Sequence, residues 1–282
     1  MLDALNPNHD QIEYWNGLAG QRWVDQQEKI DRALGPFGEA AIERLDPKLG
    51  ERIIDIGCGS GDTLCAIAQR VGSSGEVTGI DASRPLLERA RRRAGADVNV
   101  RFVEADASNY AFTPSFAALF SRFGVMFFAD PIRAFQNLRG ALQPGGRLGF
   151  VCWQSLADNA WCAVPLAAAR QVLLDAPEGP EPGAPGPFAF ADPRHIKHTL
   201  AAAGFTRIEV TSFHAPVVLS REGMDAAIDF TLRVGPVSRL IAEQPEQIRS
   251  SIGQRIRSAL AHAATRETVT LDGAAWLVAA RA

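Results

Sequence analysis

A glycine-rich turn after a β-branched run is the feature that most constrains the fold of this chain. Residues 53–56 lead directly into Gly57, Gly59 and Gly61, and helical spacing of apolar residues starts immediately afterwards. Glycine permits a positive φ and close approach of a ligand to the backbone, and the N-terminus of the following helix offers unpaired N–H groups. The segment therefore predicts a strand–turn–helix unit that binds an anionic or carboxylate-bearing cofactor.

The spacing of the glycines favours one class of cofactor. A dinucleotide fingerprint, G-x-G-x-x-G, would need glycine at position 62, where this chain has Asp62. Asp55, inside the strand, would repel a pyrophosphate but can meet a positive amino group. The methionine end of S-adenosylmethionine carries both an α-amino group and a carboxylate, so it suits both features. The alternatives are a tight turn that binds nothing and, less favoured by the spacing, a nicotinamide-dependent dehydrogenase.

Two further acids follow predicted strands and extend this interpretation. Asp81 ends the second strand, where a carboxylate can accept hydrogen bonds from both ribose hydroxyls. It could equally be a first-turn acid of the helix that starts at Ser83. Asp106 ends the third strand and can accept from the adenine amino group, with the Ala107 N–H donating to the ring. The alternative for Asp106 is a solvated loop carboxylate.

Strand and helix patterns alternate through the first half of the chain, which predicts a parallel sheet with helices on both faces. We expect strands at 52–56, 76–81, 98–104, 116–120 and 147–153, and helices at 61–71, 83–94 and 130–142. Residues 1–50 form a helical extension, and residues 51–282 a domain with helical inserts at about 157–190 and 221–264.

The remainder is less regular. Helices are expected at 159–174 and 192–203, a proline-rich loop at 176–187, and strands at 204–218 and 268–280. Residues 221–264 are mostly helical, with interruptions at Pro236 and Pro245. Within them, apolar residues recur every four positions and predict one buried stripe: Ile248, Ile252, Ile256 and Leu260.

From Glu51 to Trp153 the chain resembles the class I S-adenosylmethionine-dependent methyltransferases, in particular the small-molecule branch similar to the ubiquinone/menaquinone C-methyltransferases. The resemblance lies in the glycine loop, the acid after strand two, the Asp-Ala pair after strand three and the Leu-x-Pro-Gly-Gly turn at 142–146. It implies an α/β, Rossmann-like, seven-stranded, mostly parallel sheet whose last strand is antiparallel. The candidate cofactor-binding residues are Asp55, Gly57, Cys58, Gly59, Asp62, Thr63, Asp81, Ala82, Asp106, Ala107 and Ser121.

The acceptor is expected beyond the carboxyl ends of strands four and five, as in other parallel sheets. An Asn/Asp-Pro-Pro-Tyr/Phe motif is absent there, which argues against DNA or protein-glutamine substrates. Aromatic side chains could instead line an apolar pocket, although each could equally belong to the core. The candidates are Tyr14, Trp15, Trp23, Phe123, Phe127 and Trp153, with Phe128 and Trp161 as further possibilities.

These patterns predict methyl transfer to a small molecule, with the methylated atom left open between O, N, C and S. A protein that binds S-adenosylmethionine without turnover is the alternative. The N-terminal aromatic segment resembles a lid that closes over the cofactor, or it simply attaches the extension to the domain. His9, Glu13 and His214 qualify as proton acceptors by chemistry alone, so no catalytic residue is predicted.

Composition narrows the possible partners and the location. The net charge of −3 and pI near 6.0 disfavour a nucleic-acid partner. Four cysteines without a C-x-x-C pair, no signal peptide and no long apolar run together predict a cytoplasmic protein that does not bind membranes.

His195 and His198 have metal-pair spacing but no third ligand nearby, so no metal is expected. The N-terminal arm or the second insert could also form a homodimer contact.

Overall fold

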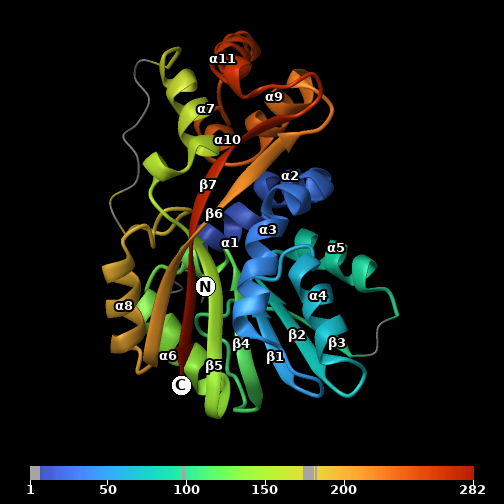
Figure 1. Ribbon diagram of the computed structural model, residues 1–282, viewed down its shortest axis with the longest axis vertical. Helices are drawn as coiled ribbons and strands as arrows, with labels where there is room; N and C mark the ends of the chain where they lie inside the picture. The colour runs from blue at the N-terminus through green and yellow to red at the C-terminus, as the bar shows by residue number, and fades with distance from the viewer. Residues whose placement is uncertain (1–6, 97–98, 174–180, 182) are drawn as a thin grey trace.

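The structure is a computed structural model that describes residues 7–96, 99–173, 181 and 183–282 (Figure 1). The strands are β1 (Arg52–Ile56), β2 (Glu76–Asp81), β3 (Val100–Glu104), β4 (Phe116–Arg122), β5 (Leu142–Trp153), β6 (Thr206–Ser220) and β7 (Val269–Arg281). The helices are α1 (His9–Asn16), α2 (Leu18–Asp25), α3 (Gln27–Leu45), α4 (Asp62–Val71), α5 (Arg84–Ala94), α6 (Pro131–Ala141), α7 (Ala160–Arg170), α8 (Pro193–Ala202), α9 (Met224–Arg233), α10 (Pro236–Leu240) and α11 (Glu246–Leu260).

The strands form one seven-stranded sheet in the order β3-β2-β1-β4-β5-β7-β6. Strands β1 to β5 pair in parallel, whereas β7 is antiparallel to both of its neighbours. This confirms the Rossmann-like fold class. The order reverses between β1 and β4, so the carboxyl ends of these two strands flank the switch point where open α/β sheets bind ligands.

Helices cover both faces of the sheet, as the alternation of side chains along β5 shows. A Cβ added to Gly149 would meet Leu45 of α3 at 2.9 Å, and one added to Gly79 on β2 would meet Leu64 of α4 at 2.3 Å. The strand register places these two glycines on the same face. The next residue, Phe150, points the other way and packs against Phe135 of α6. Helices α3 and α4 therefore share one face, and α6 lies on the opposite one.

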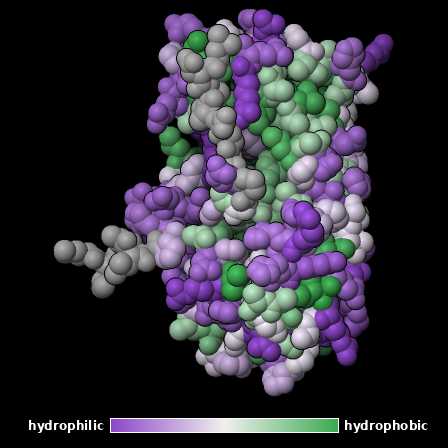
Figure 2. Space-filling model, turned by 90° about the vertical axis from the view of Figure 1, so that its left-hand side faces the viewer, coloured by the Kyte–Doolittle hydropathy of each residue, from purple (hydrophilic) through white to green (hydrophobic). Residues whose placement is uncertain are grey.

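The hairpin of β6 and β7 extends beyond the parallel strands and reaches α7, α9, α10 and α11 (Figure 1). Three residues of the predicted stripe on α11, Ile252, Ile256 and Leu260, are fully buried, and Ile248 is partly buried. Apolar residues gather in the upper half of the face that carries α6, α7 and α8, whereas hydrophilic residues dominate its lower half (Figure 2). None of the described helices has the length and apolar character to cross a membrane.

Element ends differ from the sequence predictions in several places. Strand β5 begins at Leu142, not 147, because Leu142 already pairs with Phe116 and the Pro-Gly-Gly turn becomes a register shift within the strand. Helix α7 ends at Arg170. The predicted helix end at 174, most of the loop at 176–187 and the predicted strand start at 98 lie outside the described residues.

Candidate cofactor and acceptor site

The glycine loop after β1 has the backbone geometry that its sequence predicts. Gly57, Gly59 and Gly61 all have positive φ, and helix α4 begins directly after Gly61. At Gly57 the reason is also steric, because an added Cβ would lie 3.0 Å from the Cα of Gly124. The loop after β1 and the loop after β4 therefore meet backbone to backbone at the switch point.

A cavity opens beside this loop, between the sheet and helices α1 to α3. Predicted residues that line it are Trp15, Trp23, Gly57, Cys58, Gly59, Thr63, Asp81, Ala82, Asp106, Ala107, Phe123 and Phe127, and Phe128 lines it as well. Predicted residues that do not line it are Tyr14, Asp55, Asp62, Ser121, Trp153 and Trp161.

Asp81 holds the glycine loop in shape. Its Oδ2 accepts from the backbone N–H of Gly59 at 2.8 Å, and its Oδ1 accepts from the N–H of Ser83 at 2.8 Å. Burial raises the pKa of the Asp81 carboxyl, and these backbone hydrogen bonds oppose the rise. Ser83 occupies the N-cap position of α5, but its hydroxyl donates to the carbonyl of Trp15 instead of capping the helix.

Asp55 lies one layer beneath the cavity wall, not at its surface. Its carboxylate is fully buried, and Oδ2 accepts from the hydroxyl of Thr63, which does line the cavity. Its other oxygen has no hydrogen-bond partner within the described part of the chain. Burial raises the pKa of Asp55 to about 7. Asp55 was expected to contact the cofactor directly, but it lies behind Thr63 and can act on a ligand only through that residue.

Helix α1 is attached to the residues that follow β2 and β3. The Asn8 amide donates to Asp106 Oδ1 at 3.1 Å. The Asn16 amide donates to the carbonyl of Ala82 at 2.8 Å and accepts from the N–H of Arg84 at 3.0 Å. The N-terminal extension thus covers the part of the cavity that contains the two acids predicted to bind ribose and adenine.

Aromatic side chains form one wall of the cavity. Trp15 packs edge-on against Trp23 and Phe127, with ring centroids 5.2 and 5.4 Å away. Tyr14 instead stacks under the guanidinium of Arg239 on α10, 4.0 Å from the ring centroid.

Behind the lining residue Phe123 lies Trp153, which stacks on it at 4.1 Å and is buried. Trp153 therefore supports the wall but does not form it. Phe123 itself adopts a φ of 59°, a conformation that non-glycine residues seldom adopt outside functional or strained sites.

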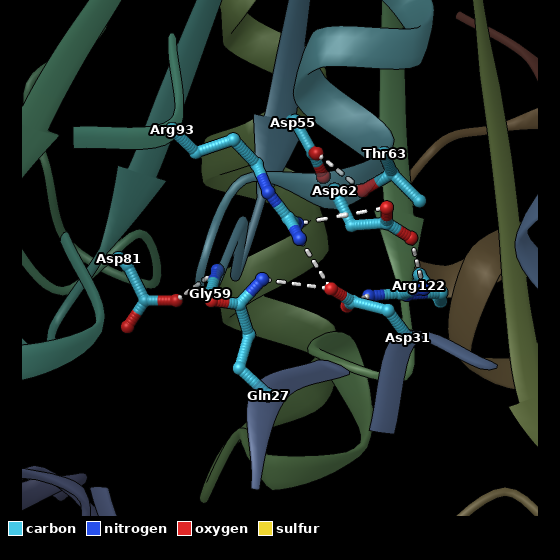
Figure 3. Close-up of polar contacts among 9 residues, drawn as sticks. All are labelled: Gln27, Asp31, Asp55, Gly59, Asp62, Thr63, Asp81, Arg93 and Arg122. Atoms are coloured by element: carbon cyan, nitrogen blue, oxygen red, sulfur yellow. Dashed lines mark hydrogen bonds and ion pairs between the residues drawn. The ribbon is translucent and has the colours of Figure 1, made fainter. Parts of the chain in front are cut away.

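A ring of alternating charges at the cavity edge was not predicted. Arg122 donates to Asp62 at 2.8 Å and lies 3.6 Å from Asp31, and Arg93 pairs with both aspartates. Figure 3 shows the amide of Gln27 and the guanidinium of Arg93 converging on the Asp31 carboxylate. Gln27, Asp31 and Arg122 line the cavity. The position of Arg122 at a strand end was a usable signal, whereas no local motif marks Gln27 or Asp31.

The proton acceptors considered from sequence lie away from the cavity lining. His9 and Glu13 pair with each other on α1 at 3.7 Å, and His214 on β6 hydrogen-bonds Ser212. Ser121 is buried and donates to the carbonyl of Ile56 at 2.7 Å, so it braces β4 against β1. Within the described part of the chain, no three His, Cys, Asp or Glu side chains are grouped to hold a metal ion.

Comparison with known proteins agrees with this geometry. Residues 53–146 match the model of a methyltransferase domain family. The chain is 29% identical over 244 residues to nocamycin O-methyltransferase of Saccharothrix syringae, covering 81% of this chain and 85% of that one. It is 33% identical over 151 residues to 2-phytyl-1,4-naphtoquinone methyltransferase of Trichormus variabilis, where the match covers 52% of this chain and 60% of that one.

Solved structures show the same fold. A phosphoethanolamine N-methyltransferase of Haemonchus contortus, crystallised with S-adenosylmethionine, superposes with a TM-score of 0.52 at 21% identity, covering 87% of this chain and 52% of that one. The YcgJ protein of Bacillus subtilis gives 0.55 at 18% identity, covering 88% and 97%. The fold, the glycine loop and the matches to known methyltransferases together define a transferase that binds S-adenosylmethionine. The methyltransferase domain at residues 53–146 and the named methyltransferase relatives support an S-adenosylmethionine-dependent methyltransferase of class I.

Proposed function

We propose that this enzyme methylates an apolar, aromatic small molecule held against Trp15, Trp23 and Phe127. The single observation that carries the proposal is the continuity of one cavity from the glycine loop to this aromatic wall. Aromatic rings offer a large apolar contact area with defined packing geometry, which suits a planar acceptor. The relatives named for a naphthoquinone and for nocamycin support a small organic acceptor.

For the cofactor we propose one set of contacts along the lining. Asp81 accepts from the ribose hydroxyls, because each of its oxygens receives one backbone N–H and keeps a further lone pair. Asp106 and the backbone of Ala107 face the adenine. The positive-φ backbone at Gly57 lets the ligand approach where a Cβ would already clash with Gly124, which is the cradle that a close-fitting cofactor needs.

S-adenosylmethionine supplies an activated methyl group, so the protein has only to orient the acceptor and exclude water. The carboxylates that line the cavity, Asp31, Asp81 and Asp106, all accept hydrogen bonds from N–H donors of the protein. Because these carboxylates are already engaged, we infer that the reaction does not depend on one of them as a general base. We therefore expect the acceptor atom to lose its proton near neutral pH, as phenols, hydroquinones and enols with electron-withdrawing substituents do.

The test is calorimetric titration of the protein with S-adenosylmethionine and, separately, with NAD, followed by methyl transfer from labelled cofactor to a panel of phenols and hydroquinones. We expect binding of the first ligand alone, and transfer to acidic aromatic acceptors. Binding without transfer to any acceptor would favour the alternative of a protein without turnover. Failure to bind S-adenosylmethionine would overturn the proposed function.

A further inference from the structure

Gln27 and Asp31 lie one turn apart on α3 and both line the cavity. Gln27 is only 3% exposed, and its amide donates to Asp31 Oδ2 at 2.8 Å. The amide oxygen of Gln27 is buried and has no hydrogen-bond partner among the described residues. Leaving a buried acceptor unpaired is costly, so this oxygen calls for a donor from a bound molecule.

Arg122 lies beside this pair with the opposite charge. Its Nη2 is 3.6 Å from Asp31 Oδ1, which is an ion pair but is longer than a hydrogen bond. Arg93 and Asp62 do not line the cavity, and they pair with Asp31 and Arg122 respectively. These outer partners compensate each charge, so the inner carboxylate and guanidinium can turn toward a ligand without being left unpaired.

Helix α3 is held against this part of the cavity by a small residue. A Cβ added to Gly38 would lie 3.0 Å from Cδ of Arg122 and 3.2 Å from Cγ2 of Thr63. Thr63 belongs to the first turn of α4, directly after the glycine loop. The mixed charges on α3 and β4 are therefore close to the loop, at its Thr63 side, whereas Asp81 contacts the loop at Gly59.

We propose that Gln27, Asp31 and Arg122 bind the zwitterionic amino-acid end of the cofactor. The ammonium donates to the Gln27 amide oxygen and to Asp31, and the carboxylate accepts from Arg122. A zwitterion needs both signs of charge side by side, and charge-assisted hydrogen bonds of this kind are about twice as strong as neutral ones. The assignment rests on the proposed function and makes α3 part of the cofactor site.

The experiment compares two ligands that differ in this end alone: S-adenosylhomocysteine and 5′-methylthioadenosine, which lacks the amino-acid portion. Their affinities are measured by calorimetry for the intact protein, for Gln27→Leu and for Gln26→Leu. Gln26 is the matched control, since it is 7% exposed and also has a buried, unpartnered amide oxygen, but does not line the cavity. We expect Gln27→Leu to weaken S-adenosylhomocysteine roughly tenfold and methylthioadenosine less than about twofold.

Gln26→Leu should leave the ratio of the two affinities unchanged. Asp31→Asn provides a second variant in case Gln27→Leu does not fold, and it should also weaken S-adenosylhomocysteine selectively. Equal weakening of both ligands, or none, would overturn this assignment and leave the proposed function standing. If the intact protein binds neither ligand, the proposed function itself fails.

Discussion

Asp55 is a buried carboxyl group whose protonation couples the stability of the glycine loop to pH. Burial raises its pKa from 3.8 to about 7 in the folded protein, whereas the unfolded chain keeps the ordinary value. Between these two values the folded state binds the proton more tightly. The contribution of Asp55 to stability is therefore greatest at low pH, falls as pH rises through this window and levels off above it.

We predict that the free energy of unfolding in urea falls between about pH 4 and about pH 7 by an amount on the order of a few kcal/mol attributable to Asp55. Asp55→Asn keeps the shape and removes the titration, so its stability should change less over the same range. Asp225→Asn, which removes an exposed aspartate paired with Arg257, serves as the control and should keep the original slope. Identical slopes for Asp55→Asn and the unmodified protein would contradict the prediction.

Asp81 offers a direct test of the ribose contact. An amide in place of the carboxylate cannot accept from both Gly59 and Ser83 and also from a ribose hydroxyl. We expect Asp81→Asn to weaken S-adenosylmethionine by about tenfold or more in calorimetry. Asp192→Asn changes an exposed aspartate that caps α8 and should leave the affinity unaltered. An unaltered affinity for Asp81→Asn would remove Asp81 from the site.

For single residues, two things limited prediction from the sequence: how far apart the residues lie along the chain, and whether a side chain reaches the cavity surface or lies behind it. The positions of Asp81 and Asp106 in the cavity lining were predictable because a strand end fixes where its next side chain lies. Gln27 and Asp31 lie far from the strand ends in sequence, and only tertiary packing brings them to Arg122. Asp55 and Trp153 have suitable chemistry but lie one layer behind the wall, and depth of this kind is not encoded in spacing.

Among the elements, the loops after β1 and β4 are in close backbone contact. A Cβ on Gly124 would lie 2.7 Å from the carbonyl oxygen of Ile56 and 3.0 Å from the Ser121 hydroxyl. Neither neighbour can move freely, since one is backbone of β1 and the other is buried.

We predict that Gly124→Ala destabilises the protein by about 1–3 kcal/mol in urea unfolding and weakens cofactor binding, because the two loops are forced apart. Gly140→Ala is the matched control. Gly140 is an exposed residue of α6 whose added Cβ meets no atom within 4 Å, so alanine there should change stability by less than about 1 kcal/mol, in the stabilising direction. Equal stability of both variants would show that the loops can separate without cost.

Element identity was largely predictable, and element ends were not. The alternation of β-branched runs and amphipathic helices identified the strands of the sheet because each periodicity reflects burial. The predicted start of β5 was wrong because a Pro-Gly-Gly turn normally ends strand pairing, whereas here Leu142, before the turn, already pairs with Phe116. The pairing depends on a neighbouring strand more than twenty residues earlier in the chain, so local sequence could not show it.

For the whole molecule, α1 and the residues after β2 and β3 form the closing surface over the cavity. We predict that binding of S-adenosylhomocysteine slows amide hydrogen exchange in α1 and α2, because the ligand adds contacts beneath them. Helix α8, which packs against α6 and β6, should exchange at an unchanged rate. If exchange in α1 and α2 is also unchanged, the extension is only an attachment and does not act as a lid.

The hydrogen bonds from Asn8 and Asn16 to the residues beyond β3 and β2 have a consequence for traffic through the enzyme. If the methyl donor enters and the spent cofactor leaves beneath α1, these hydrogen bonds have to break for both events. In that case the opening of the first helix, and not methyl transfer, would set the turnover rate.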